Sequence, residues 1–293
     1  MKNQQLKEFM QAQGLGQKQV ANAFGVSVTT VSQYLSGKYQ GNCEELDRKI
    51  DEMLERQKAK VVEAKYNAEF VPTLAAKRGM EVMQFAHVEG EINVIFGAAG
   101  LGKTQMLKEY ARRNSSAVLI EVDPSCTPKV LLRKIAESVG ATARGINNEL
   151  LDSIVSKLKG SERLLMVDEA ELLSTRSLEF IRRIHDLSGI GVVLAGMPRL
   201  LVNLKGKNNE LAQLYSRVGF ACDLGNALPD DDLALLAESA LGTDEFNAPL
   251  IKACKGNARR LSKLMRGVVR SSEINGIPIS AELVERYAGM LIS

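Results

Sequence analysis

Residues 92–104, "INVIFGAAGLGKT", carry the strongest indication of how this chain folds. The first five residues form an apolar run typical of a buried strand. The next eight match G-x-x-x-x-G-K-[ST] at every fixed position. Glycines let backbone N–H groups turn inward around phosphates, and a helix that begins near the lysine points its positive end at them. The stretch therefore predicts a strand, a phosphate-binding loop and a helix.

Each part of this loop has a chemical role in nucleotide binding. Lys103 suits the β- and γ-phosphates of ATP, and the Thr104 hydroxyl suits Mg²⁺. ATP and Mg²⁺ are therefore the expected cofactors. The residues expected to surround the phosphates are Gly97, Ala98, Ala99, Gly100, Leu101, Gly102, Lys103, Thr104 and Gln105.

A second apolar run, "RLLMVDEAELL", places Asp168 and Glu169 at the carboxyl end of a predicted strand, where open α/β sheets bind ligands. We expect Asp168 to hold Mg²⁺, directly or through water, and Glu169 to polarise an attacking water as general base. Adjacent acids can also simply begin a helix. The phosphate loop favours the catalytic interpretation, which is hydrolysis of ATP to ADP and phosphate.

The chain divides into three segments that differ in their hydrophobic pattern. Residues 1–64 carry only helical periodicity. Residues 65–225 alternate helix-length segments with short apolar runs, which predicts a parallel sheet with helices on both faces. Residues 226–293 show short helical patterns only. The apolar runs are 92–96, 117–122, 164–167, 191–195 and 218–223.

One predicted strand, "AVLIEV", lies between the phosphate loop and the acid pair in the chain. This spacing fits P-loop ATPases whose acid strand is not next to the loop strand, the group that holds AAA+ proteins. The expected fold class is therefore α/β: an AAA+ P-loop ATPase core with an N-terminal helix-turn-helix domain and a small C-terminal helical lid.

Composition sets limits on the class of protein. With 45% hydrophobic and 25% charged residues among 293, the chain is typical of a soluble globular protein. No apolar run approaches the ~20 residues that span a membrane, and the polar N-terminus lacks a signal-peptide core. We expect a cytoplasmic protein with no membrane partner. A net charge of +3 is compatible with nucleic acid without arguing for it.

The N-terminal stretch "QKQVANAFGVSVTTVSQYLSG", residues 17–37, has the pattern of a helix-turn-helix. Gly25 allows a left-handed turn, and Ser27 caps a second helix whose inner face holds Val28 or Val31. A small helical bundle that contacts proteins is the alternative. The candidates to face DNA are Thr29, Thr30, Ser32, Gln33 and Lys38.

Other parts of an AAA+ ATPase can be sought by position. Met197 stands after the fourth strand, where such proteins usually present Asn or Gln toward the γ-phosphate. Arg217, in "LYSRVG", has the position of an arginine finger that reaches into a neighbouring subunit; a solvated surface arginine is the alternative. In "KGNARRL", Arg259 matches the lid arginine that senses nucleotide, and the spacing leaves Arg260 open as well.

The most basic stretch lies near the C-terminus. It is "KACKGNARRLSKLMRGVVRSSE", residues 252–273, and its cations flank an apolar helical stripe. Such a face is either simply solvated or follows DNA phosphates, with binding that weakens as salt rises. The sequence leaves both open.

The domain order and several short segments resemble the MuB-like family, the transposition target-selecting AAA+ ATPases of phage Mu. The similarity runs nearly the whole chain. The segments that carry it are "FV-x-T" (Phe70, Val71 and Thr73), "SGKYQGN", "DPSC" (123–126), "VDEAE" and "LYSRVG".

The resemblance implies a bacteriophage protein that acts in DNA transposition in the host cytoplasm. It implies ATP-dependent, non-sequence-specific binding to double-stranded DNA, on which the protein assembles with itself as a helical filament. Such a protein selects target DNA, delivers it to a DDE transposase and activates that enzyme. Weak ATP hydrolysis, stimulated by DNA and transposase, then releases it near the element's own ends, which is target immunity.

The resemblance also implies roles for particular residues. Phe70, Val71 and Thr73 are expected near the adenine. Because Met197 departs from the expected Asn, we expect slow or DNA-dependent hydrolysis. Loops of the core are expected to contact DNA through Lys129, Arg133, Lys205 and Lys207.

Two other classes of function remain open. One is another AAA+ helper, of the IstB type or the secretion-associated ExeA type; the helix-turn-helix and the lack of a membrane segment count against the second. The other is a helix-turn-helix regulator whose P-loop domain only senses nucleotide. The intact Lys103, Thr104, Asp168 and Glu169 argue against a sensor, whereas Met197 keeps it open.

Overall fold

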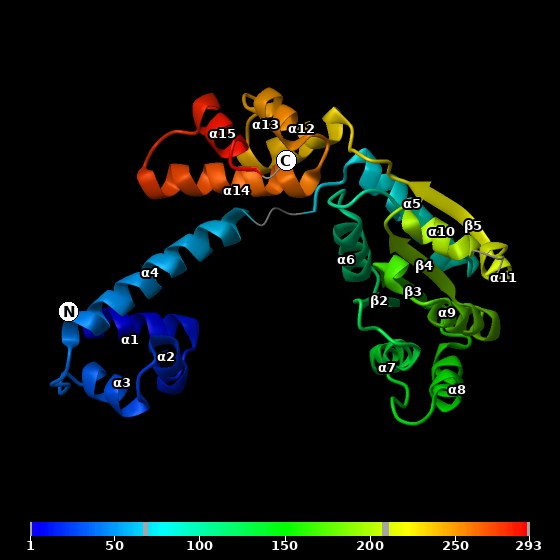
Figure 1. Ribbon diagram of the computed structural model, residues 1–293, viewed down its shortest axis with the longest axis horizontal. Coiled ribbons are helices and arrows are strands. Elements are labelled where there is room, and N and C mark those ends of the chain that lie inside the picture. The colour runs from blue at the N-terminus through cyan, green and yellow to red at the C-terminus, as the bar shows by residue number, and fades with distance from the viewer. Residues whose placement is uncertain (1, 67–69, 207–210, 292–293) are drawn as a thin grey trace. The chain divides into compact units, whose positions relative to one another are not determined.

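The computed structural model describes residues 2–66, 70–206 and 211–291, and side chains are described outside 57–66. The chain forms two compact units (Figure 1). One comprises residues 1–67 with 269–278, and the other comprises residues 68–268 with 279–293.

The smaller unit contains the helix-turn-helix. Its helices are α1 (Lys2–Gln13), α2 (Gln17–Phe24), α3 (Val28–Leu35) and α4 (Cys43–Tyr66). Gly25 ends α2 at a φ of 65°, and the Ser27 hydroxyl caps α3 by accepting from the Thr30 N–H at 3.0 Å. Val31 is the buried inner residue, whereas Val28 is 45% exposed. The core of this unit consists of Leu6, Val20, Ala21, Phe24, Val31, Tyr34, Leu35, Leu46 and Ile50.

The larger unit is built on a five-stranded parallel sheet of order β2-β3-β4-β1-β5. Because β4 lies between β1 and β3, the phosphate-loop strand and the acid strand are not neighbours. The predicted AAA+ fold class is confirmed. The strands are β1 (Ile92–Phe96), β2 (Ala117–Glu121), β3 (Leu164–Asp168), β4 (Gly191–Gly196) and β5 (Val218–Asp223).

Helices cover both faces of this sheet, as its buried strands require. On one face, α5 (Leu74–Glu89) packs on β1, β4 and β5, and α6 (Lys103–Arg113) packs on β2 and β3. The other face holds the main apolar core, where Ile135, Ile154 and Ile181 are fully buried. Its helices are α7 (Pro128–Val139), α8 (Asn147–Leu158), α9 (Thr175–Ser188) and α10 (Arg199–Lys205), with the 3-10 turn η1 (Ala170–Leu172) and α11 (Ala212–Tyr215) nearby.

The C-terminal part is helical, as predicted. Asp232 of α12 is 4% exposed and accepts hydrogen bonds from the N–H groups of Leu74, at 2.7 Å, and Ala75, at 3.0 Å. A carboxylate at a helix N-terminus is stabilising, so this contact fixes α12 to the start of α5. The helices are α12 (Asp230–Leu241), α13 (Asn247–Cys254), α14 (Ala258–Asn275) and α15 (Ala281–Ala288).

Candidate nucleotide and DNA sites

The phosphate loop joins β1 to α6 through a glycine backbone. Gly100 and Gly102 have φ values of 82° and 95°, in the left-handed region that residues with a Cβ rarely adopt. Two main-chain hydrogen bonds hold the first residues of the loop in place. The Gly97 N–H donates to the Gly196 carbonyl at 3.3 Å, and the Ala98 N–H donates to the Gly225 carbonyl at 2.9 Å. The turn itself therefore requires Gly102, a fixed position of the motif, and Gly100, which occupies one of its variable positions.

Lys103 lies inside this loop. Its ammonium donates to the carbonyls of Gly97 and Ala98, both at 2.8 Å. Burial lowers the pKa of Lys103, and the carboxylates of Glu171 and Asp168 oppose that shift. The loop thus holds a cation whose two carbonyl contacts can be exchanged for phosphate oxygens.

Thr104 and Asp168 come together from α6 and β3. The Thr104 hydroxyl donates to Asp168 Oδ2 at 2.6 Å, and Asp168 is 4% exposed. Hydroxyl and carboxylate oxygens are the hard ligands that Mg²⁺ prefers, usually alongside phosphate oxygens and water. These two side chains therefore fit a magnesium ion shared with a nucleotide.

Glu169 has an unusual backbone. Its φ of 55° places a residue with a Cβ in the left-handed region, and its N–H donates to Asp168 Oδ1 at 3.0 Å. Its side chain is exposed. Non-glycine residues in this region are uncommon and cluster at functional sites. The conformation turns the chain sharply after the acid strand and presents the Glu169 carboxylate to solvent.

The start of α14 contacts the phosphate loop. Asn257 donates from its amide to the Ala99 carbonyl at 2.9 Å, and the Arg259 N–H donates to the Gly100 carbonyl at 3.1 Å. A Cβ at Gly100 would lie 2.4 Å from the Asn257 amide oxygen. Asn257 was not among the predicted site residues, although this asparagine stands beside the arginines in "KGNARRL".

Of the two lid arginines, Arg259 contacts the loop through its main-chain N–H, which donates to the Gly100 carbonyl. Burial and the Arg259 charge both lower the pKa of Lys103, so the Arg259 charge acts on the phosphate loop. The Arg260 guanidinium instead donates to the Ala253 carbonyl at 3.5 Å, inside the lid. Arg259 is therefore the better candidate to sense nucleotide.

The "FV-x-T" segment precedes α5. Thr73 is buried and caps α5 by accepting from the Ala76 N–H at 3.1 Å. The Arg113 guanidinium lies 5.7 Å from the centre of the Phe70 ring. Arg113 ends α6 and Lys103 begins it, so about 15 Å of helix separates them. The adenine contacts of Phe70, Val71 and Thr73 stay a prediction.

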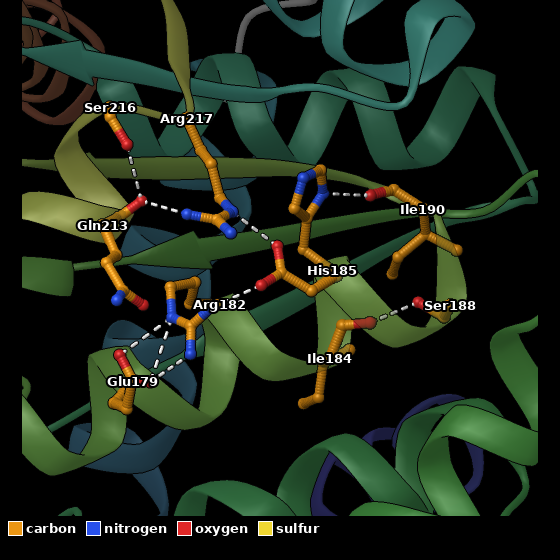
Figure 2. Close-up of polar contacts among 10 residues, drawn as sticks. Glu179, Arg182, Ile184, His185, Ser188, Ile190, Gln213, Ser216 and Arg217 are labelled. Atoms are coloured by element: carbon orange, nitrogen blue, oxygen red, sulfur yellow. Dashed lines mark hydrogen bonds and ion pairs between the residues drawn. The ribbon is translucent and has the colours of Figure 1, made fainter.

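Arg217 is anchored rather than loosely solvated (Figure 2). Its Nε donates to Asp186 Oδ1 at 2.6 Å, and its guanidinium also donates to the Gln213 carbonyl at 2.5 Å. Asp186 accepts a second bond from Arg182, which in turn pairs with Glu179. No sequence pattern predicted that Asp186 would hold this arginine.

The position after β4 lacks the expected polar side chain. Met197 is 42% exposed and therefore does not occupy the interior of the site. The end of β4 is faced instead by Glu171, whose Oε2 would lie 2.2 Å from a Cβ on Gly196. Glu171 was absent from the sequence prediction.

The helix-turn-helix presents most of its predicted DNA-facing residues. Thr29, Ser32, Gln33 and Lys38 are exposed. Thr30 is half-buried, and its hydroxyl lies 2.9 Å from the Ser27 hydroxyl. Part of its hydrogen-bonding capacity therefore serves the helix cap. The sequence missed Val28 as an exposed residue of this face, where an apolar group can contact a thymine methyl.

Cationic residues also line the ATPase core. Lys129, Arg133 and Lys205 are exposed, and the Lys205 ammonium lies 5.6 Å from the centre of the Tyr215 ring. Lys207 lies outside the described residues. Lys129 and Arg176 line a hollow of about 310 Å³ together with Ile146, Asn147 and Asn148.

This hollow brings three helix N-termini together. Lys129 is the second residue of α7, Asn147 is the first residue of α8, and Arg176 is the second residue of α9. Helix N-termini carry partial positive charge, so they add to the two cations. The sequence named Lys129 but missed Arg176, because the two are 47 positions apart in the chain (176 − 129).

Known proteins resemble both units. A family model described as an AAA domain matches residues 87–204, and one described as a helix-turn-helix matches residues 6–40. The chain is 33% identical over 205 residues to the ATP-dependent target DNA activator B of Escherichia phage Mu. The chain is therefore similar to the MuB-like transposition proteins. That alignment covers 69% of this chain and 65% of the phage Mu protein.

A second relative aligns over a larger part of its own length. The Mu-like prophage FluMu DNA transposition protein B of Haemophilus influenzae is 29% identical over 245 residues, which cover 82% of this MuB-like chain and 85% of that protein. The AAA domain match and the similarity to an ATP-dependent protein support nucleotide binding and ATPase activity.

A solved structure shares the fold. The Aeropyrum pernix ORC2 protein, in its ADPNP–ADP complexes, matches with a TM-score of 0.64 at 18% identity, over 78% of this MuB-like chain and 72% of that one. None of the helices in the described parts of the chain combines the length and apolarity needed to cross a bilayer.

Proposed function

We propose that this MuB-like chain is an ATPase that binds double-stranded DNA without sequence specificity and assembles on it as an ATP-dependent filament. It selects target DNA and delivers it to a DDE transposase, which it activates. Hydrolysis is weak alone and is stimulated by DNA and transposase, and it supports target immunity. The meeting of Lys103, Thr104 and Asp168, in a chain 33% identical to an ATP-dependent target DNA activator, carries this proposal.

Each residue of the nucleotide site has its own role in ATP binding or hydrolysis. Loop N–H groups and Lys103 bind the phosphates, and Glu169 takes the proton of the attacking water. Thr104 and Asp168 would hold Mg²⁺, which neutralises charge on the phosphates when bound. Arg259 contacts the nucleotide from the lid and so couples lid position to its phosphates.

Arg217 links hydrolysis to assembly. Its contacts lie on α9 and α11, where Asp186 holds the guanidinium. A finger inserted into the next subunit makes a heterologous interface, which builds a filament when it does not close into a ring. Assembly then depends on the γ-phosphate, and many modest DNA contacts repeated along the filament give tight binding despite a net charge of +3.

DNA contacts come from two surfaces in this proposal. The helix-turn-helix offers Thr29, Thr30, Ser32, Gln33 and Lys38. The core offers Lys129, Arg133, Arg176, Lys205 and Lys207, of which Lys129 and Arg176 share one hollow. Each phosphate contact adds about 0.9 to the slope of log affinity against log salt.

We expect the double variant Lys129→Ala/Arg176→Ala to reduce that slope by about 2 per subunit, because two phosphate contacts are lost. The measurement is fluorescence anisotropy on random duplex DNA at several salt concentrations, with a slowly hydrolysed ATP analogue. Lys159→Ala is the control, because Lys159 is exposed just beyond the far end of α8. An unchanged slope in the double variant would remove the hollow from the DNA-binding surface.

Electron microscopy tests the proposed function as a whole. With random duplex DNA, we expect continuous filaments in ATP or a slowly hydrolysed analogue and none in ADP. The contrast follows from a γ-phosphate that completes the contact between subunits. Discrete particles at fixed sites, present with either nucleotide, would support a nucleotide-sensing regulator instead.

A further inference from the structure

Glu171 is a buried acid with no role in the scheme above. It lies in η1, three positions after Asp168, and is 9% exposed. Its backbone carbonyl accepts a hydrogen bond from the Asn203 amide at 2.9 Å and one from Arg199 at 3.3 Å. These contacts from α10 hold the main chain of η1 in place next to β4.

The Glu171 carboxylate is incompletely satisfied. Its Oε2 is buried and has no hydrogen-bond partner in the described structure. A buried acceptor without a donor is unfavourable, and buried polar groups in folded proteins are nearly always paired. The free oxygen therefore points to a donor that arrives with a ligand.

The surroundings of that oxygen identify the ligand. A Cβ on Gly196 would lie 2.2 Å from Oε2, so the carboxylate lies over the last residue of β4. Gly196 pairs with Phe96 at the end of β1, and its carbonyl accepts from the first N–H of the phosphate loop at 3.3 Å. The unpaired oxygen is thus beside the phosphate loop, at the carboxyl edge of the sheet.

The Glu171 carboxylate also interacts electrostatically with Lys103, the cation of the phosphate loop. Among charged groups, its carboxylate acts on Lys103 more strongly than Asp168 does. A carboxylate and a phosphate are both acceptors, so the group between them must be a donor. Water at the γ-phosphate meets this requirement.

We propose that Glu171 is a water-positioning residue of the ATP site. It supplies, from η1, the polar group that Met197 does not supply at the end of β4. Its carboxylate accepts a hydrogen bond from the water at the γ-phosphate and orients it, while Glu169 takes the proton. This inference rests on the proposed ATPase function, and it assigns an acid that neither the motif nor the family match singles out.

The variant Glu171→Gln tests it, with Glu137→Gln on the exposed side of α7 as control. We expect DNA-stimulated hydrolysis to fall on the order of 10²-fold. The neutral amide is a weaker acceptor than a carboxylate, and its NH₂ group can donate to the γ-phosphate in place of the water, which then loses its alignment. ATP should bind about fivefold tighter, since a negative charge near the γ-phosphate is removed, and ADP affinity should stay unchanged. Binding is measured with fluorescent nucleotides, and the Tm should not fall, because a neutral amide replaces an unpaired buried acid.

A second variant moves the carboxylate without removing it. Gly196→Ala places a Cβ in contact with Oε2 and should lower hydrolysis similarly. In the background of Glu171→Ala, the same change should cost little more, because contacting residues show non-additive effects. Additive losses would overturn the proposed contact.

The outcomes separate this inference from the proposed function. Wild-type hydrolysis matched by Glu171→Gln, with an unchanged ratio of ATP to ADP affinity, overturns the inference alone. Absence of wild-type hydrolysis contradicts the proposed ATPase. Even then, the affinity ratio decides whether Glu171 faces the γ-phosphate.

Discussion

The variant Lys103→Ala is expected to bind ATP about 10²-fold more weakly and to hydrolyse it at background rate. Lys103 is the cation held inside the phosphate loop, where it makes two charge-assisted hydrogen bonds at 2.8 Å. When a nucleotide binds, these carbonyl contacts can be exchanged for phosphate oxygens. Each charge-assisted hydrogen bond to phosphate contributes about 1.5–3 kcal/mol, so losing two of them weakens binding by at least two powers of ten. The measurements are fluorescent-nucleotide titration and phosphate release with duplex DNA present.

Lys108→Ala is the matched control for this experiment. Lys108 lies on the same helix, and its ammonium pairs with Glu121 at 2.8 Å, where it is half-exposed. An exposed ion pair contributes little, so nucleotide binding should remain near the wild-type value. A clear ATPase rate in Lys103→Ala would remove the assigned nucleotide site.

Mixing variants tests whether Arg217 acts on a neighbouring subunit. Arg217→Ala should lose hydrolysis on the order of 10³-fold, as removal of an arginine finger does. In an equal mixture with Lys103→Ala, about a quarter of the interfaces pair an intact loop with an intact finger, so hydrolysis should partly return. No recovery in the mixture would place Arg217 outside the catalytic interface.

A large effect on hydrolysis is also expected for Glu169→Gln. We expect normal ATP binding with hydrolysis reduced by about 10²- to 10⁴-fold, the range associated with a general base. Glu169 holds its position through its own N–H, which donates to Asp168 at 3.0 Å, so an isosteric side chain leaves Thr104 and Asp168 undisturbed. If hydrolysis releases the protein from DNA, the variant should stay bound after dilution, as measured by the decay of DNA anisotropy.

Glu162→Gln controls for the backbone conformation of Glu169. Glu162 has a φ of 50° and is exposed in the loop before β3, at the opposite end of that strand from the acid pair. It should hydrolyse ATP at the wild-type rate. Wild-type turnover by Glu169→Gln would mean that another residue acts as the base.

Much of the site could be predicted from short stretches of sequence. The motif between residues 97 and 104 fixes the turn, because left-handed glycines at 100 and 102 are local backbone requirements. The apolar run 164–167 places Asp168 at the end of β3, since parallel strands end at the same edge. Capping by Ser27 likewise depends on a hydrogen bond only three residues long.

Other functional contacts join residues that no local pattern connects. Asn93 stands inside an apolar run, yet its buried amide donates to the Val82 carbonyl and accepts from the Phe220 N–H. In the sequence, Asp186 has only the pattern of a residue near a helix end; in the structure its carboxylate accepts a hydrogen bond from Arg217. In each case the partner is chosen by packing across the fold, not by the neighbouring sequence.

The strand–loop–helix of the phosphate loop, the acid pair and the helix-turn-helix could all be predicted from short stretches of the chain. Their geometry follows from backbone conformation and periodicity over a few residues. That Asp232 caps α5 and that Glu171 faces Gly196 became evident only in the folded chain. Those relations arise because burial brings distant polar groups together, and each buried group then requires a partner.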